Sequence, residues 1–140
     1  MYTAARDCDK QSDPGESKMT NKELVLKFID EVFNAHDLSK LDDYMRDDYM
    51  QHSFGVADGK KGFIGFANEF FKKGPFMDVK KVFENENNEV AVFFECRFAD
   101  GSHAKVVDIY RIEDGKLAEH WDTPCPLPAD DTTASGRSSF

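Results

Sequence analysis

The segment VVDIYRIEDGKLAEHWD, residues 106–122, predicts the fold more clearly than any other part of the chain. Two arms rich in apolar residues flank an Asp-Gly pair, and Asp-Gly in that setting is a strong signal for a β-hairpin. The same arms carry Asp108, His120 and Asp122, although their other residues look half buried. We therefore asked why a packed pair of strands would contain three ionisable side chains.

The rest of the chain shows a regular order of helical and extended patterns. Thr20 and Glu23 form a capping box that begins an amphipathic helix, which we expect to end near His36. Further helices are expected at about 38–45 and 60–73, and strands at about 48–53, 76–84, 89–98, 102–112 and 116–123. Short connections between the last four strands indicate an antiparallel meander. The pattern predicts an α+β fold, with three N-terminal helices packed on a curved, mostly antiparallel sheet.

Composition sets the limits of the domain and its setting. A chain of 140 residues suits one hydrophobic core. We expect a disordered lead-in at 1–18, a folded domain at 19–128 and a flexible tail at 129–140, because both ends are polar. The three cysteines are too widely spaced for a zinc site or a disulfide framework. They predict reduced thiols and a cytoplasmic location.

Charge and hydropathy exclude several classes of partner. The net charge of −9 and the pI of about 4.8 argue against nucleic acid and anionic membrane surfaces, which require a basic patch. The chain has no apolar run near the roughly 18 residues that a membrane span needs. The acidic balance therefore argues against a polyanionic partner.

The alternation of side chains places the three ionisable residues of the hairpin on one face. Asp108 shares a face with Val106 and Tyr110, and this more apolar face should lie under the helices. A three-residue loop would put Asp108 directly opposite His120, with Asp122 on the same face. A buried carboxylate needs a partner. The pair is therefore either a structural bridge that closes the hairpin or an acid and a base that line a cavity.

Two segments, YMQHSFGVADGKKGFIGF at 49–66 and the hairpin at 106–122, resemble the SnoaL-like group of the NTF2-like superfamily, in particular its predicted aldol-condensation enzymes. The resemblance covers about residues 20–128. It implies a conical pocket between sheet and helices, with acid/base chemistry that needs no metal and no organic cofactor. In ketosteroid isomerases of this superfamily, an acidic residue at the position of Asp108 forms part of the oxyanion hole, and the general base lies at about the position of His52.

These observations predict an enzyme that moves protons next to a carbonyl group of a small apolar ligand, by aldol-type cyclisation or isomerisation. The first-helix tyrosine of the isomerases has no match, since Phe28 and Ile29 stand there. The expected catalytic residues are His52, Asp108 and His120, and the expected substrate contacts are Asp122, Tyr110, Phe28 and Phe66. The sequence leaves open which group is the base and whether Asp108 is protonated.

Two further expectations concern binding. Val107, Ile109 and Trp121 have the opposite parity to the ionisable residues and would supply apolar surface on the outer face of the sheet. We expect a homodimer through that face, as is common among NTF2-like domains. The alternative to an enzyme is a non-catalytic NTF2-like module that binds a ligand or another protein.

Overall fold

The computed structural model describes residues 19–140, so the lead-in expected at 1–18 lies outside the described residues. Its helical layer begins as predicted, because the Thr20 side chain accepts from the Glu23 backbone and the Glu23 side chain caps Thr20 in return. The helical elements are α2 (Asn21–Phe28), its π-helical continuation η2 (Ile29–Asn34), α3 (Leu41–Tyr44), α4 (Gly59–Phe70) and the 3-10 turn η3 (Phe71–Lys73). Within residues 19–140, no helix is long and apolar enough to cross a membrane.

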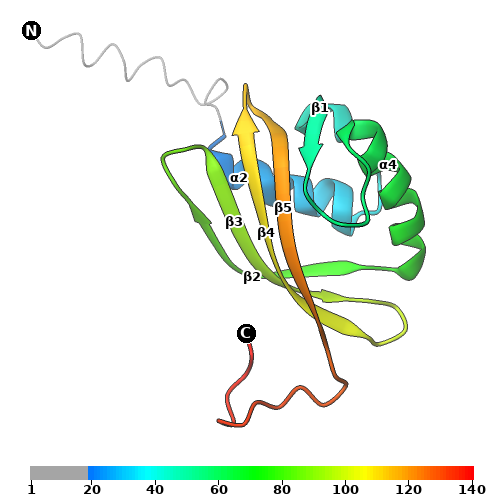
Figure 1. The fold of residues 1–140 in the computed structure, drawn as a ribbon, viewed down its shortest axis with the longest axis vertical. Coiled ribbons are helices and arrows are strands. Elements are labelled where there is room, and N and C mark those ends of the chain that lie inside the picture. The colour runs from blue at the N-terminus through cyan, green and yellow to red at the C-terminus, as the bar shows by residue number, and fades with distance from the viewer. Residues whose placement is uncertain (1–18) are drawn as a thin grey trace, which may run out of the picture.

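Five strands form one curved sheet, and the helices cover its concave face (Figure 1). They are β1 (Met45–Gln51), β2 (Phe76–Glu84), β3 (Glu89–Arg97), β4 (His103–Glu113) and β5 (Lys116–Leu127), in the spatial order β1-β5-β4-β3-β2. Strands β2 to β5 form the predicted antiparallel meander, while β1 runs parallel to β5. The predicted α+β architecture is therefore confirmed.

The turn between β4 and β5 is shorter than expected. Asp114 and Gly115 both have a positive φ, 54° and 74°, and Glu113 lies opposite Lys116. These are the properties of a two-residue turn of type I′, whose twist matches that of the flanking strands. The expected three-residue loop is thus wrong, and the strand register that follows from it is wrong as well.

A bulge at Ala118 shifts the register once more, because Arg111 opposes Glu119 whereas Ile112 opposes Leu117. Beyond the bulge, Asp108 lies opposite Asp122 and Tyr110 lies opposite His120. The expected direct opposition of Asp108 and His120 is therefore wrong. Beyond the bulge the total shift is two residues, however, which leaves the predicted faces of Asp108, His120 and Asp122 unchanged. All three ionisable residues lie on the helix-covered face.

The core between the helices and the sheet is rich in aromatic rings. Phe28 is completely buried, and its ring centroid lies 5.9–6.0 Å from those of Phe33, Tyr44, Phe63 and Tyr110. Edge-to-face packing of this kind adds to the stabilisation from burial alone. This cluster ties α2 and α4 to the centre of β4 and so fixes the wall on which Asp108 lies.

The chain after β5 lies against the outer face of the sheet. The Phe140 ring centroid lies 5.8 Å from that of Phe93, and Lys105 Nζ donates to the Ser139 carbonyl oxygen at 3.3 Å. The tail expected to be flexible thus has contacts with the sheet. Ile109 on the same face is 36% exposed, next to Trp121. The homodimer through this face stays a prediction.

An ion pair on the outer face gives stability a pH dependence. Glu95 accepts from His103 Nδ1 at 2.7 Å, which raises the pKa of His103 and lowers the pKa of Glu95. The stabilisation of the folded state by His103 is complete below the ordinary histidine pKa of about 6.5, and it is lost as pH rises through the raised pKa of the folded protein. The stabilisation by Glu95 is lost as pH falls below about 4.5, the ordinary glutamate pKa.

We expect the wild type to have a higher thermal midpoint at pH 6 than at pH 8.5, and His103→Gln to reduce this difference. An equal difference in both proteins, measured by circular dichroism, would contradict the assignment.

Candidate functional site

A cavity of about 610 Å³ lies between the concave face of the sheet, α4 and the segment 51–56. Its wall is largely aromatic. The phenylalanines that line it are Phe33, Phe54, Phe63, Phe66, Phe70, Phe94 and Phe98. Cys96 also lies on the wall, and burial raises the pKa of its thiol to about 11, so the thiol is uncharged at neutral pH. A cavity of this size and lining suits a small ligand with a planar apolar body.

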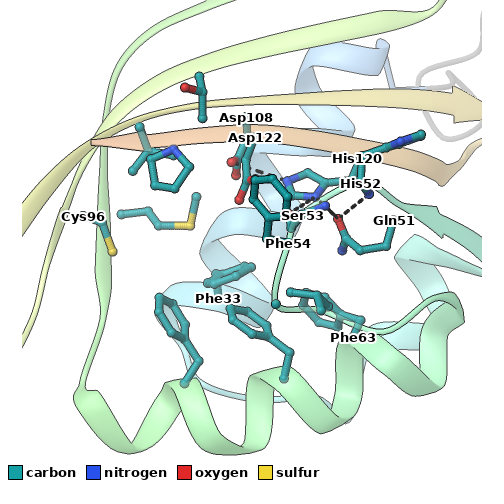
Figure 2. A pocket seen from close by; sticks show the side chains of 18 of the residues that line it. Phe33, Gln51, His52, Ser53, Phe54, Phe63, Cys96, Asp108, His120 and Asp122 are labelled. Atoms are coloured by element: carbon teal, nitrogen blue, oxygen red, sulfur yellow. Dashed lines mark hydrogen bonds and ion pairs between the residues drawn. The ribbon is translucent and has the colours of Figure 1, made fainter. Parts of the chain in front are cut away.

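One side of the cavity is polar, and we call it the polar end: it consists of Tyr49, Asp108, Tyr110, His120 and Asp122. Figure 2 shows its carboxylates and imidazole across the cavity from Phe33 and Phe63. Within residues 19–140, Asp108 and His120 are the two buried residues that are charged or polar. The structure thus places Asp108, His120 and Asp122 at one cavity, and the catalytic and substrate-binding roles expected for them stay predictions.

Asp108 and His120 face each other within a short chain of contacts. His120 Nε2 lies 3.4 Å from Asp108 Oδ1, and the Tyr110 hydroxyl donates to Asp108 Oδ2 at 2.9 Å. Burial and the negative charge of Asp108 hold the pKa of Tyr110 well above its usual range. Tyr110 therefore stays protonated and keeps donating its hydroxyl hydrogen to Asp108.

Gln51 fixes the tautomer of His120. The Gln51 side-chain oxygen accepts from the backbone amides of His52 and Ser53, each at 3.1 Å, which identifies that atom as the oxygen rather than the nitrogen. The same oxygen lies 2.7 Å from His120 Nδ1, so Nδ1 must carry a hydrogen. In the neutral ring, the lone pair is then on Nε2, the nitrogen that faces Asp108.

Asp122 completes a group of three acidic and imidazole side chains. Asp108, His120 and Asp122 each offer one ligand atom, and these atoms lie within 4.8 Å of one another. Such a set has the donor types that a divalent cation accepts. The sequence prediction of no metal and no cofactor stays a prediction.

The other residues expected at the site differ in whether their side chains reach the cavity. Phe66 lines the cavity, whereas Phe28 lies behind the wall in the core. His52 borders the cavity, but its ring stacks on Trp121 with centroids 4.9 Å apart, and its Nε2 lies 2.8 Å from Glu119 Oε2. Its imidazole is therefore not brought together with the Asp108 carboxylate and the His120 imidazole.

Two residues of the site did not follow from the sequence, Gln51 and Tyr49. Both lie on β1, which pairs with β5 so that Gln51 is opposite His120. Alternation along the predicted strand already placed these two side chains on one face and Met50 with His52 on the other. That signal could have identified them.

Solved structures of similar fold come from several bacteria. An NTF2-like protein of unknown function from Cytophaga hutchinsonii ATCC 33406 has a TM-score of 0.65 at 19% identity, with 78% of this chain and 93% of that chain covered. IdmH from Streptomyces antibioticus, a proposed polyketide cyclase, has a TM-score of 0.65 at 17% identity, with 76% and 92% covered. AclR from Streptomyces galilaeus, a proposed hydroxylase, has a TM-score of 0.63 at 20% identity, with 75% and 78% covered. These likenesses show the NTF2-like fold.

Sequence comparison gives a consistent result. No functionally curated protein matches the chain. The sequence profile of the SnoaL-like domain, by contrast, matches residues 25–120. The matched region runs from the first described helix to His120 and includes most of the polar end. The chain therefore belongs to the SnoaL-like domain family and has the NTF2-like fold that its sequence resemblance implied.

Proposed function

We propose that the protein catalyses proton transfer at the carbon next to a carbonyl group in a small apolar ligand, as in an aldol-type cyclisation or an isomerisation. The observation that carries the proposal is the buried Asp108–His120 pair, 3.4 Å apart, at the polar end of an otherwise aromatic cavity. Titratable groups gathered in an apolar cavity are a feature of catalytic sites. The fold likeness to a proposed polyketide cyclase agrees with this class of reaction.

In the proposed mechanism, His120 is the base. The lone pair on Nε2 takes a proton from the carbon next to the carbonyl, the C–H bond breaks, and its electron pair moves onto the carbonyl oxygen to give an enolate. The negative charge of Asp108, whose Oδ1 lies 3.4 Å from Nε2, stabilises the imidazolium that forms. The enolate carbon then takes a proton back from the imidazolium, or it attacks a second carbonyl carbon, whose oxygen becomes an alkoxide and takes that proton. Either path regenerates the neutral imidazole.

Hydrogen bonds from neighbouring side chains hold both His120 and Asp108 in place for this step. The Gln51 oxygen holds the hydrogen on Nδ1, so the basic nitrogen always faces the cavity side. Tyr110 holds Asp108 from the other side. The base and its counter-charge are thus positioned before substrate binds, which lowers the cost of reorganisation.

Deuterium exchange tests the proposal without knowledge of the natural substrate. We expect the wild-type protein to accelerate the exchange of the α-protons of 2-tetralone in D₂O, followed by NMR, because this planar ketone fits an aromatic cavity. Acetone is the matched control, since it can meet bases on the protein surface but cannot fill the cavity. The assay is run with and without a chelator, and equal rates would support chemistry that uses no metal.

Two outcomes would overturn the proposal. One is exchange of 2-tetralone at the rate of buffer alone, at protein concentrations that bind the ketone. The other is equal acceleration of 2-tetralone and acetone, which would place the base on the surface. Binding of the ketone without exchange would favour a non-catalytic ligand-binding module.

A further inference from the structure

The hydroxyl group of Tyr49 is an unused donor at the polar end of the cavity. Three tyrosines lie within residues 19–140, and all are buried. Tyr44 donates to Glu31 at 2.6 Å and Tyr110 donates to Asp108 at 2.9 Å. The hydrogen bonds of the described residues include none from Tyr49, which is 1% exposed. Buried hydroxyl groups normally have a partner, so this one needs an explanation.

The position of Tyr49 indicates where its partner would come from. Its side chain lines the cavity, with its ring centroid 6.3 Å from that of His120 and the two rings nearly parallel at 19°. Its hydroxyl oxygen is not sealed inside the protein, since Ser139 Oγ is the one fully enclosed side-chain polar atom without a partner among the described residues. The hydroxyl therefore opens into the cavity, where a ligand atom can meet it.

The neighbours of Tyr49 determine what kind of atom it can bind. Asp108, Asp122 and Nε2 of neutral His120 are acceptors at the polar end. Burial, with the charges of Asp108 and Asp122, holds the pKa of Tyr49 well above its usual range, so the hydroxyl keeps its proton. The Tyr49 hydroxyl is therefore a donor, and the ligand atom that it can bind is an acceptor, such as a carbonyl or an enolate oxygen.

We propose that Tyr49 donates the hydrogen bond that holds the oxygen of the ligand and stabilises the enolate formed next to His120. Tyr49 lies on β1, whereas the first helix of this chain carries Phe28 and Ile29 at the place of the isomerase tyrosine. The ligand class is accordingly a planar apolar compound with one oxygen acceptor at its edge. The kinetic part of this inference rests on the proposed function, whereas the binding part does not.

Tyr49→Phe tests the binding part with 2-naphthol as a stand-in for the enolate, and with naphthalene as its counterpart without oxygen. We expect the variant to bind 2-naphthol about 3- to 10-fold more weakly, the usual range for one hydrogen bond, and to bind naphthalene as the wild type does. Fluorescence titration gives both affinities. Equal loss for the two ligands would overturn the inference, because it would indicate a change of shape rather than a lost donor.

Stability supplies a control that does not depend on any ligand. Because the Tyr49 hydroxyl has no hydrogen-bond partner among the described residues, Tyr49→Phe is expected to unfold at the same or a higher urea concentration than the wild type. Tyr110→Phe loses its bond to Asp108 and is expected to unfold at a lower concentration. A similar destabilisation of both variants would show that Tyr49 has a structural partner and would contradict the inference.

The kinetic part separates this inference from the proposed function. Tyr49→Phe is expected to lower kcat for α-proton exchange about 10²-fold with a smaller change in KM, as for the loss of one donor to an oxyanion. If the wild type catalyses exchange but Tyr49→Phe keeps full kcat and full 2-naphthol affinity, the inference fails and the proposed function stands. If the wild type catalyses no exchange but 2-naphthol binding depends on Tyr49, the proposed function fails and the ligand-binding donor stands.

Discussion

A His120→Gln variant is expected to lose about 10²–10⁴-fold of its rate of α-proton exchange, the range that a positioned general base contributes. Glutamine keeps a polar side chain of similar length but has no lone pair that can take a proton at neutral pH. The rate constant is measured by NMR with 2-tetralone under saturating conditions. Asp108→Asn should lower the rate in the same direction, because the imidazolium would lose its counter-charge.

Two other histidines provide matched controls for this result. His103→Gln changes the outer face, where the ring contacts Glu95, and should leave the exchange rate unchanged. His52→Gln should also retain most of the rate, because the ring of His52 contacts Glu119 and Trp121. Loss of exchange in His52→Gln with a full rate in His120→Gln would reverse the assignment. It would restore the base expected from the family resemblance.

Phe28→Ala is expected to reduce the free energy of unfolding by about 3–5 kcal/mol, the usual cost of removing a buried aromatic ring. Phe28 is fully buried against four aromatic rings from helices and sheet, so little can collapse into the space that it leaves. Because domains of this size are stable by only about 5–15 kcal/mol, the variant would lose a large part of its stability. Urea denaturation followed by circular dichroism measures the change.

Phe66→Ala is the matched comparison, since both residues were expected to contact substrate. Phe66 is only partly buried and lines the cavity. Its truncation should cost less stability than that of Phe28 but should weaken the binding of both 2-naphthol and naphthalene. Should Phe28→Leu, a milder change, weaken ligand binding without loss of stability, Phe28 would belong to the cavity wall after all.

Local signals in the sequence predicted the elements of the fold well. The capping box at Thr20 and the short connections between strands both act over a few residues. Such signals depend on backbone and side-chain preferences that are visible in the sequence itself. The packing of Phe140 on the sheet depends on contacts between distant segments, and the polar composition of the tail did not indicate it.

The candidate site was predicted in part for the same reason. Alternation placed Asp108, His120 and Asp122 on one face, and this holds in the structure. Which residues lie directly opposite each other depends on the type of turn and on the bulge. The alternative turns, and the strand with or without a bulge, differ by small energies, and the sequence carries no clear signal for either choice. His52 was assigned to the site by analogy with relatives, although its alternation with Gln51 indicated the opposite face.

The bulge at Ala118 has a consequence for how relatives of this protein should be compared. If the same residues kept the register that leaves the turn, without the bulge, Glu119 and Trp121 would point into the cavity in place of His120 and Asp122. The chemistry of the cavity thus depends on how the two strands pair as much as on the identity of their residues. A homologue that keeps every residue of this hairpin but lacks the bulge could keep the letters HWD and still present an indole to its ligand.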